Sequence, residues 1–239
     1  MMKSVLLGAC GLALAAAGAN ATTFSFASDT NHQNWTFAGL GALISAAGPT
    51  NPQVLLVDDD NGALPALSFT VEFRASMQLA PTASVPIGGG NFLHVYNVAA
   101  VPEGPAGFGF FLPDGSPLLV ATFSTATFRA AGPQGAWGSA ANLSASDLSG
   151  SVTYTWFGPD MPSYGLYQGQ SSIGMDDAAF TFTNINSDSG PGVPLGDGSM
   201  PNQAWNSEGS YSGTAHFVPA PGTAALLGLA GVCVSRRRR

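Results

Sequence analysis

The sequence predicts an all-β protein, a single antiparallel β-sandwich of jelly-roll type between two short apolar terminal segments. Gly and Pro number 31 and 17 among 239 residues, which excludes a coiled coil and disfavours long helices. Residues 67–79 alternate strictly between apolar and polar side chains, as in a strand with one buried face. Many other short apolar runs are separated by turn residues, a pattern typical of sandwiches and barrels.

The expected strands follow one another through the body of the chain, residues 22–217. Besides 67–79, they are 23–27, 53–57, 92–99, 118–128, 151–157, 179–185 and 211–217. The segment 67–79 would be about 40 Å long, so we expect a bend or a bulge in it. One short helix fits either 40–47 or 140–148. Residues 186–209 are rich in Gly, Pro, Asp, Asn and Ser and predict a long loop.

Charged residues are few and unevenly distributed. They make up 9% of the chain, against about 25% in an ordinary soluble domain. The body holds two basic residues, Arg74 and Arg129, and all fourteen acidic ones, a net charge of −12. Such a body cannot neutralise a run of phosphates, so we expect no nucleic-acid partner. The only cysteines, Cys10 and Cys233, lie in the terminal segments, which leaves the body without disulfides.

Residues 1–21 have the organisation of a secretory signal peptide. Lys3 precedes an apolar run over 5–17, and the small residues Ala19 and Ala21 frame a cleavage site, so the mature chain should begin at Thr22. A retained anchor helix and a lipoprotein with its lipid on Cys10 are the alternatives. The apolar run before Cys10 is short for a lipoprotein signal.

The last segment, residues 218–239, has three parts. The stiff, extended motif Pro219, Ala220, Pro221 and Gly222 comes first. Twelve small or apolar residues follow, a helix of about 18 Å, short of the ~30 Å hydrocarbon core of a bilayer. Four arginines close the chain: Arg236, Arg237, Arg238 and Arg239.

Together with the signal peptide, this tail resembles a PEP-CTERM sorting signal, although Ala220 stands where that family's name expects Glu. The resemblance covers only about the last 22 residues. It implies the export machinery and an exosortase-type membrane protease as partners, with transient membrane contact through the tail. It also implies delivery to the cell envelope, outer surface or extracellular matrix of a bacterium. An ordinary C-terminal membrane anchor is the alternative.

Acidic residues provide tentative calcium ligands. Asp58, Asp59 and Asp60 precede Asn-Gly, and calcium favours several oxygen ligands. The spacing fails the EF-hand pattern, and Asn-Gly between two apolar runs favours a turn. Asp176 and Asp177 are a second candidate, since adjacent carboxylates repel unless a cation lies between them.

Exposed aromatic rings could bind a carbohydrate, and we expect Tyr164, Tyr167 and Trp205 at the surface, whereas Trp156 alternates with Val152 and should lie in the core. No catalytic motif is present, and an enzyme is not expected. The sequence therefore predicts a non-enzymatic surface or matrix protein that requires no cofactor. The alternative is a carbohydrate-binding module, with or without calcium and with exopolysaccharide as partner, and a hydrolase is the third reading.

Overall fold

The computed structural model describes residues 20–27, 35–37, 42–46, 53–99, 107–146, 152–174, 176–186, 192–196 and 199–218. These residues are mainly strands, with the short 3-10 helix η2 (Pro162–Tyr164). In chain order the strands are β1 (Asn20–Ala27), β2 (Trp35–Phe37), β3 (Ala42–Ala46), β4 (Gln53–Asp59), β5 (Leu67–Gly88), β6 (Asn91–Ala99), β7 (Gly107–Phe111), β8 (Pro117–Phe123), β9 (Ala126–Pro133), β10 (Ala136–Trp137), β11 (Ala141–Ser146), β12 (Val152–Trp156), β13 (Gln170–Ser171), β14 (Asp177–Thr183), β15 (Val193–Pro194) and β16 (Trp205–Phe217). The all-β prediction is confirmed.

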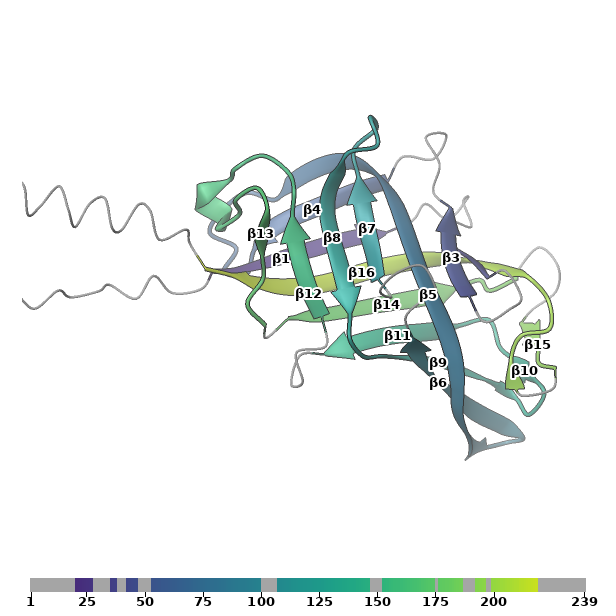
Figure 1. Ribbon diagram of the computed structural model, residues 1–239. Coiled ribbons are helices and arrows are strands. Elements are labelled where there is room, and N and C mark those ends of the chain that lie inside the picture. Colours follow the sequence, from purple (N-terminus) through teal and green to yellow (C-terminus); the bar gives the residue numbers. More distant parts are fainter. Residues whose placement is uncertain are drawn as a thin grey trace, which may run out of the picture.

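Fourteen of these strands form one large antiparallel sheet. Its order is β13-β12-β8-β7-β5-β3-β2-β16-β14-β11-β9-β6, with β1 and β4 bridging β16 and β5 on a side path. β6 pairs with β5 as well, so the path of pairings returns to β5. In Figure 1, β12, β8, β7 and β5 run steeply across β1, β16, β14 and β11. The short strands β10 and β15 pair only with each other.

β5 connects the two crossing parts of the sheet. It pairs with β4, β7, β3 and β6 at successive positions. The expected alternation is confirmed, because Phe73 and Met77 are buried whereas Arg74 and Ser76 are exposed. The strand continues beyond the expected end to Gly88, with register shifts after Pro81 and Pro86. These irregularities are bulges, which bend a strand that would otherwise be too long for one flat sheet.

Aromatic side chains fill the core between the crossing parts. The ring of Phe108 on β7 lies 4.9 Å from the rings of both Phe180 on β14 and Tyr211 on β16, measured between centroids. Trp35 on β2 packs edge-on against Phe73 on β5 at 4.8 Å. Such pairs contribute about 0.5–1.5 kcal/mol each beyond the apolar area they bury. The core therefore joins strands that share no hydrogen bonds.

Two segments that were expected to be a short helix or a loop are strands. Residues 40–47 and 140–148 contain β3 and β11, so the helix expected in one of them is wrong. In β11, Leu143 is buried and Asn142 exposed, and both edges of the strand pair, with β9 and β14. Pairing on both edges overrides the helix propensity of alanine. The long loop expected over 186–209 is interrupted by β15 and by the start of β16.

Candidate functional site

The two ends of the body lie side by side. β1 and β16 are antiparallel neighbours, and Asn20 at the start of β1 pairs with Phe217 at the end of β16. The expected mature residue Thr22 is fully buried, and its hydroxyl donates a hydrogen bond to the carbonyl of Tyr164 at 2.8 Å. β1 begins two residues before Thr22, so cleavage after Ala21 would remove the last two pairs of this ladder.

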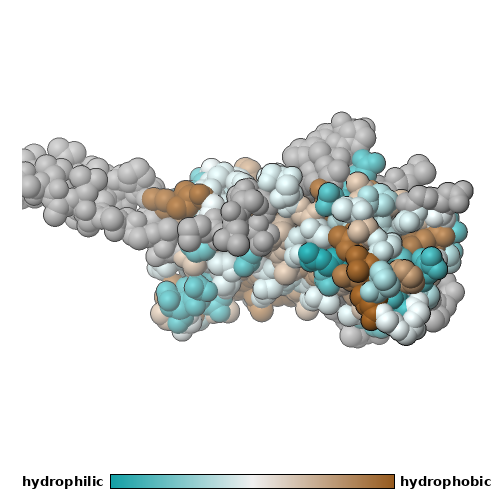
Figure 2. Space-filling view, turned by 90° about the horizontal axis from the view of Figure 1, so that it is seen from below, coloured by the Kyte–Doolittle hydropathy of each residue, from teal (hydrophilic) through white to brown (hydrophobic). Residues whose placement is uncertain are grey.

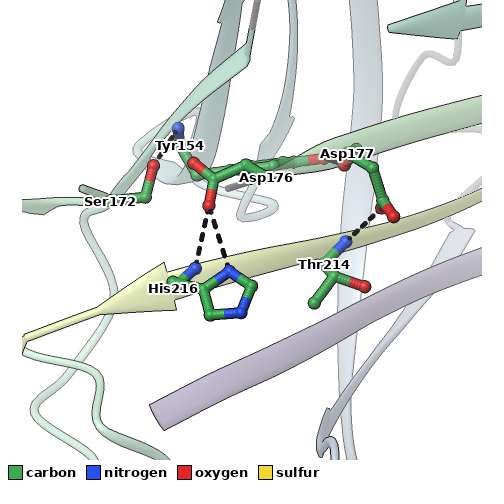
Figure 3. A network of polar contacts seen from close by, with 6 residues as sticks. All are labelled: Tyr154, Ser172, Asp176, Asp177, Thr214 and His216. Carbon is green, nitrogen blue, oxygen red and sulfur yellow. Dashed lines mark hydrogen bonds and ion pairs between the residues drawn. The ribbon is translucent and has the colours of Figure 1, made fainter. Parts of the chain in front are cut away.

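Two adjacent carboxylates hold the end of β16. Asp177 accepts the backbone N–H of Thr214 at 2.8 Å, and Asp176 accepts that of His216 at 2.9 Å (Figure 3). β14 begins at Asp177, so Asp176 lies just before this strand. Its carboxylate accepts a backbone N–H of β16 at a position that the backbone of β14 does not reach. Asp176 is fully buried and Asp177 is exposed. Asp176 and Asp177, which were expected as calcium ligands, thus accept hydrogen bonds from backbone N–H groups of β16.

The polar atoms of Asp176 and His216 are incompletely paired. The second carboxylate oxygen of Asp176, Oδ2, is buried without a hydrogen-bond partner among the described residues, as is Nδ1 of His216. Nδ1 lies 3.6 Å from Oδ1 of Asp176, too far for a good hydrogen bond. The imidazole is therefore beside the carboxylate but is not what holds it. The backbone N–H of His216 holds it instead (Figure 3).

A pair of buried tyrosines joins β14, β12 and β16 behind these carboxylates. The hydroxyl of Tyr154 donates to the carbonyl of Asp177 at 2.5 Å and accepts from the hydroxyl of Tyr211 at 2.8 Å. Burial raises the pKa of both phenols. Ser172 exchanges hydrogen bonds with the backbone of Tyr154, its hydroxyl oxygen accepting the N–H at 2.9 Å (Figure 3).

β13 and the residues directly after it also bind the end of β16 and Val218 beyond it. The N–H of Ile173 donates to the carbonyl of His216 at 3.0 Å, and the side-chain amide of Gln170 donates to the carbonyl of Val218. We call the set Gln170, Ile173, Asp176 and Asp177, with its bonds to residues 214–218, the β16 clamp. Sequence reasoning selected the two aspartates but missed Gln170 and Ile173, since nothing local in the sequence predicts a contact more than 40 residues away.

The Asp58–Asp60 segment forms the turn that the sequence favoured. The carboxylate of Asp59 accepts the N–H groups of Ala63 and Leu64 at 3.1 and 2.9 Å, which lowers the pKa of Asp59, with the bond from Leu64 as the main cause. Gly62 has a φ of 61°, a left-handed conformation that glycine tolerates. The asparagine-glycine signal therefore has a local structural explanation.

The structure does not bring the five aspartates together. β1 and β16 lie between Asp58–Asp60 and the Asp176–Asp177 pair. Within the described ranges, no three His, Cys, Asp or Glu side chains are grouped so that they could hold a metal ion. Calcium binding stays a prediction.

Two of the three aromatic residues expected at the surface are buried, so that expectation is wrong for them. Trp205 is 2% exposed and packs against Phe37 and Trp137. Tyr164 is 8% exposed, and its hydroxyl donates to the carbonyl of Pro65 at 2.6 Å. Tyr167 is partly exposed. The three rings therefore offer no shared sugar platform, whereas the core position expected for Trp156 is confirmed.

Most of the residues expected to direct export and sorting lie outside the described residues. These are Ala19, the motif Pro219, Ala220, Pro221 and Gly222, and the arginines Arg236, Arg237, Arg238 and Arg239. Ala21 lies in β1. Among the residues that the structure describes, no helix has the length and apolar character needed to cross a bilayer. Comparison of the chain with family models, curated proteins and solved structures found no match.

Proposed function

We propose that this protein is an exported, non-enzymatic surface or extracellular-matrix protein of a bacterium, with a structural or adhesive role, held through its C-terminal strand. The observation that carries the proposal is the position of β16. This strand, the last described before the sorting motif at 219–222, lies inside the sheet with β1 on one side and β14 on the other. A body fastened by an interior strand is harder to detach than one fastened by an edge strand.

The β16 clamp strengthens this argument. A pull on the chain beyond Val218 acts along β16, and it loads the hydrogen bonds to β1 and β14 in shear, all at once. The bonds of Asp176, Asp177 and Gln170 lie at the end of the strand that is next to the pulled segment. Fraying is normally easiest at such an end. The side chains of the β16 clamp oppose fraying at this end, which is the end that a tether would pull.

The surface supports a structural role more than a lectin with an aromatic platform. Among the described residues the exposed large hydrophobic side chains include a single aromatic, Phe157, together with Val54, Leu56, Val85, Ile87, Ile173 and Val218. In Figure 2 the visible face is mostly pale or teal, with brown in separate places. Few of the exposed described residues are charged, and such a surface suits a protein that lies among other polymers.

We also propose that the two crossing parts of the sheet form the faces of a sandwich, with the aromatic core between them.

The hydrolase hypothesis gains no support from the polar network in Figure 3. A triad requires a hydrogen bond between nucleophile and base. The hydroxyl oxygen of Ser172 accepts the N–H of Tyr154, and no hydrogen bond joins Ser172 to His216 among the described residues.

Mass spectrometry of the protein recovered from the cell surface and medium of its native host tests the proposal. We expect an N-terminus at Thr22 and a C-terminus within 218–222. A variant carrying both Pro219→Ala and Pro221→Ala should keep its tail and stay in the membrane fraction, whereas Pro201→Ala, a proline distant from the tail in sequence, should be processed normally. Mature protein that still ends in Arg239 would refute tail-dependent sorting.

A further inference from the structure

A notch lies on the outer face of the sheet, where β7 runs between β5 and β8. Two rows of paired residues cross these strands, Ser76–Gly107–Thr122 and Arg74–Gly109–Val120. Because both middle positions are glycine, β7 contributes no side chain of its own at these two rows between β5 and β8. The notch has a volume of about 250 Å³, and its strands lie side by side at the front of Figure 1.

The glycines and one aromatic ring fix the shape of the notch. A Cβ atom at Gly107 would overlap the carbonyl oxygen of Ala121, and one at Gly109 would lie 2.9 Å from a ring carbon of Phe111. The Phe111 ring therefore lies over Gly109 and closes one end of the notch. A larger residue at Gly107 would collide with the backbone of β8, whereas one at Gly109 would have to displace the Phe111 ring.

Arg74 is held in place beside this ring. Its guanidinium carbon lies 4.4 Å from the centroid of the Phe111 ring, and one of its nitrogens donates to the carboxylate of Glu72 at 2.6 Å. The Glu72 side chain is 9% exposed and that of Arg74 is 50% exposed. Guanidinium has five N–H donors, so donors remain for a ligand. A pre-positioned donor loses less conformational entropy on binding than a free one.

The lining of the notch combines an apolar surface with a few polar groups. The lining includes the glycine backbone and Val120, with the Phe111 ring at one end, and its polar side chains are those of Ser76, Thr122 and Arg74. A small number of polar groups around an apolar surface is the usual composition of a ligand site. A sugar ring is the matching shape, because its C–H faces are apolar and its edge carries hydroxyls.

The volume of the notch and the charge of the body restrict the class of ligand further. The notch is smaller than the 300–1,000 Å³ of sites for drug-sized ligands, so it suits one or two sugar units. The positive charge of Arg74 is paired with Glu72, and the body carries a net charge of −12. A polyanion would be repelled by this field. We propose that the notch binds a neutral sugar unit within a polysaccharide chain, without calcium.

Calorimetric titration of the purified full-length protein in mild detergent tests this proposal, which is independent of tail processing. The probes are oligosaccharides of neutral glucan, neutral galactan and neutral mannan, and an oligouronate, each with and without EDTA. We expect saturable binding of at least one neutral probe, unchanged by EDTA, and at least tenfold weaker binding of the oligouronate.

The variant Ser76→Trp fills the notch and should reduce affinity at least tenfold. The matched control is Thr70→Trp on the same exposed face of β5, where Thr70 pairs with Val54 of β4 away from the notch, and it should leave affinity unchanged. Arg74→Gln should also weaken binding at least fivefold, with thermal denaturation showing that each variant is folded. The proposal is overturned if no neutral probe binds, if EDTA abolishes binding, if only the oligouronate binds, or if Ser76→Trp binds as the wild type does.

Discussion

Replacing Asp176 by alanine removes the buried carboxylate that accepts the His216 N–H, and it is the sharpest test of the β16 clamp. A hydrogen bond to a charged group contributes about 1.5–3 kcal/mol, and a buried donor left unpaired costs about 1–3 kcal/mol. Asp176 is fully buried, so water cannot replace the lost oxygen. We therefore expect a loss of roughly 2–3 kcal/mol.

Two further variants test the parts played by the charge and by burial. Asp176→Asn keeps an acceptor at Oδ1 and removes the buried charge whose Oδ2 lacks a partner among the described residues. It should therefore stay within about 1 kcal/mol of the wild type. Asp177→Ala removes the same kind of bond, from Thr214, at an exposed site where water can take its place. It should cost no more than about 0.5 kcal/mol.

The assay is thermal denaturation of the full-length protein followed by circular dichroism, with and without EDTA. In a domain of this size each kcal/mol shifts Tm by about 2–4 °C, so Asp176→Ala should melt roughly 4–12 °C lower. An Asp177→Ala variant that loses as much as Asp176→Ala would refute the argument from burial. If EDTA lowers the wild-type Tm and Asp176→Asn removes that effect, Asp176 is a metal ligand.

For three other perturbations the structure gives the direction of the change in stability or association. Burial raises the pKa of Tyr154 and Tyr211, so above pH 10 the unfolded chain releases protons that the folded chain keeps, and stability should be intact below pH 10 and fall as the pH rises above it; the phenolate absorbance of these two tyrosines should appear together with loss of circular dichroism, and their ionisation in the folded state would contradict this. Gly213→Ala places a methyl group against both tyrosine hydroxyls and should cost about 1–3 kcal/mol, measured by urea denaturation; an unchanged midpoint would contradict it. Pro81→Val together with Pro86→Val should cause concentration-dependent association in light scattering, and a double variant that stays monomeric would show that the two prolines do not protect the edge of β5.

The alternating segment 67–79 shows what sequence alone could predict. A strict period of two fixes which face of a strand is buried, whatever its neighbours are, and β5 has the expected faces. Trp205 was missed because the closing strand was expected to begin at Tyr211. Extending the same alternation backward through Gly209 and Ser207 puts Trp205 on the buried face, as the structure does. That signal was present in the sequence and was obscured by the surrounding Gly, Asn and Ser.

The roles of Asp176 and of the notch could not be predicted in this way. The pair Asp176–Asp177 has the same local sequence whether it binds a cation, faces solvent or accepts N–H groups from another strand. Only the register of β14 against β16 decides between these possibilities. The notch similarly depends on two strand pairings, which place Gly107 between Ser76 and Thr122 and Gly109 between Arg74 and Val120. Pairings between distant strands set both features, and no short-range pattern encodes them.

The two prolines of β5 lie in a strand although proline disfavours strand pairing, and the long-range pairing of the strand explains their positions. Pro81 pairs with Tyr96 and Pro86 with Phe92, four residues apart on β6 although five apart on β5. The bulge after Pro81 supplies the extra residue, so both prolines occupy the same phase of the ladder. Proline has no N–H to donate, and in a strand it is tolerated where that position faces an open edge. In the described structure β3 covers that edge only as far as Gln78. A body with so few charges cannot rely on lysines to protect an edge, and the prolines remove outward N–H groups that another strand would need for pairing.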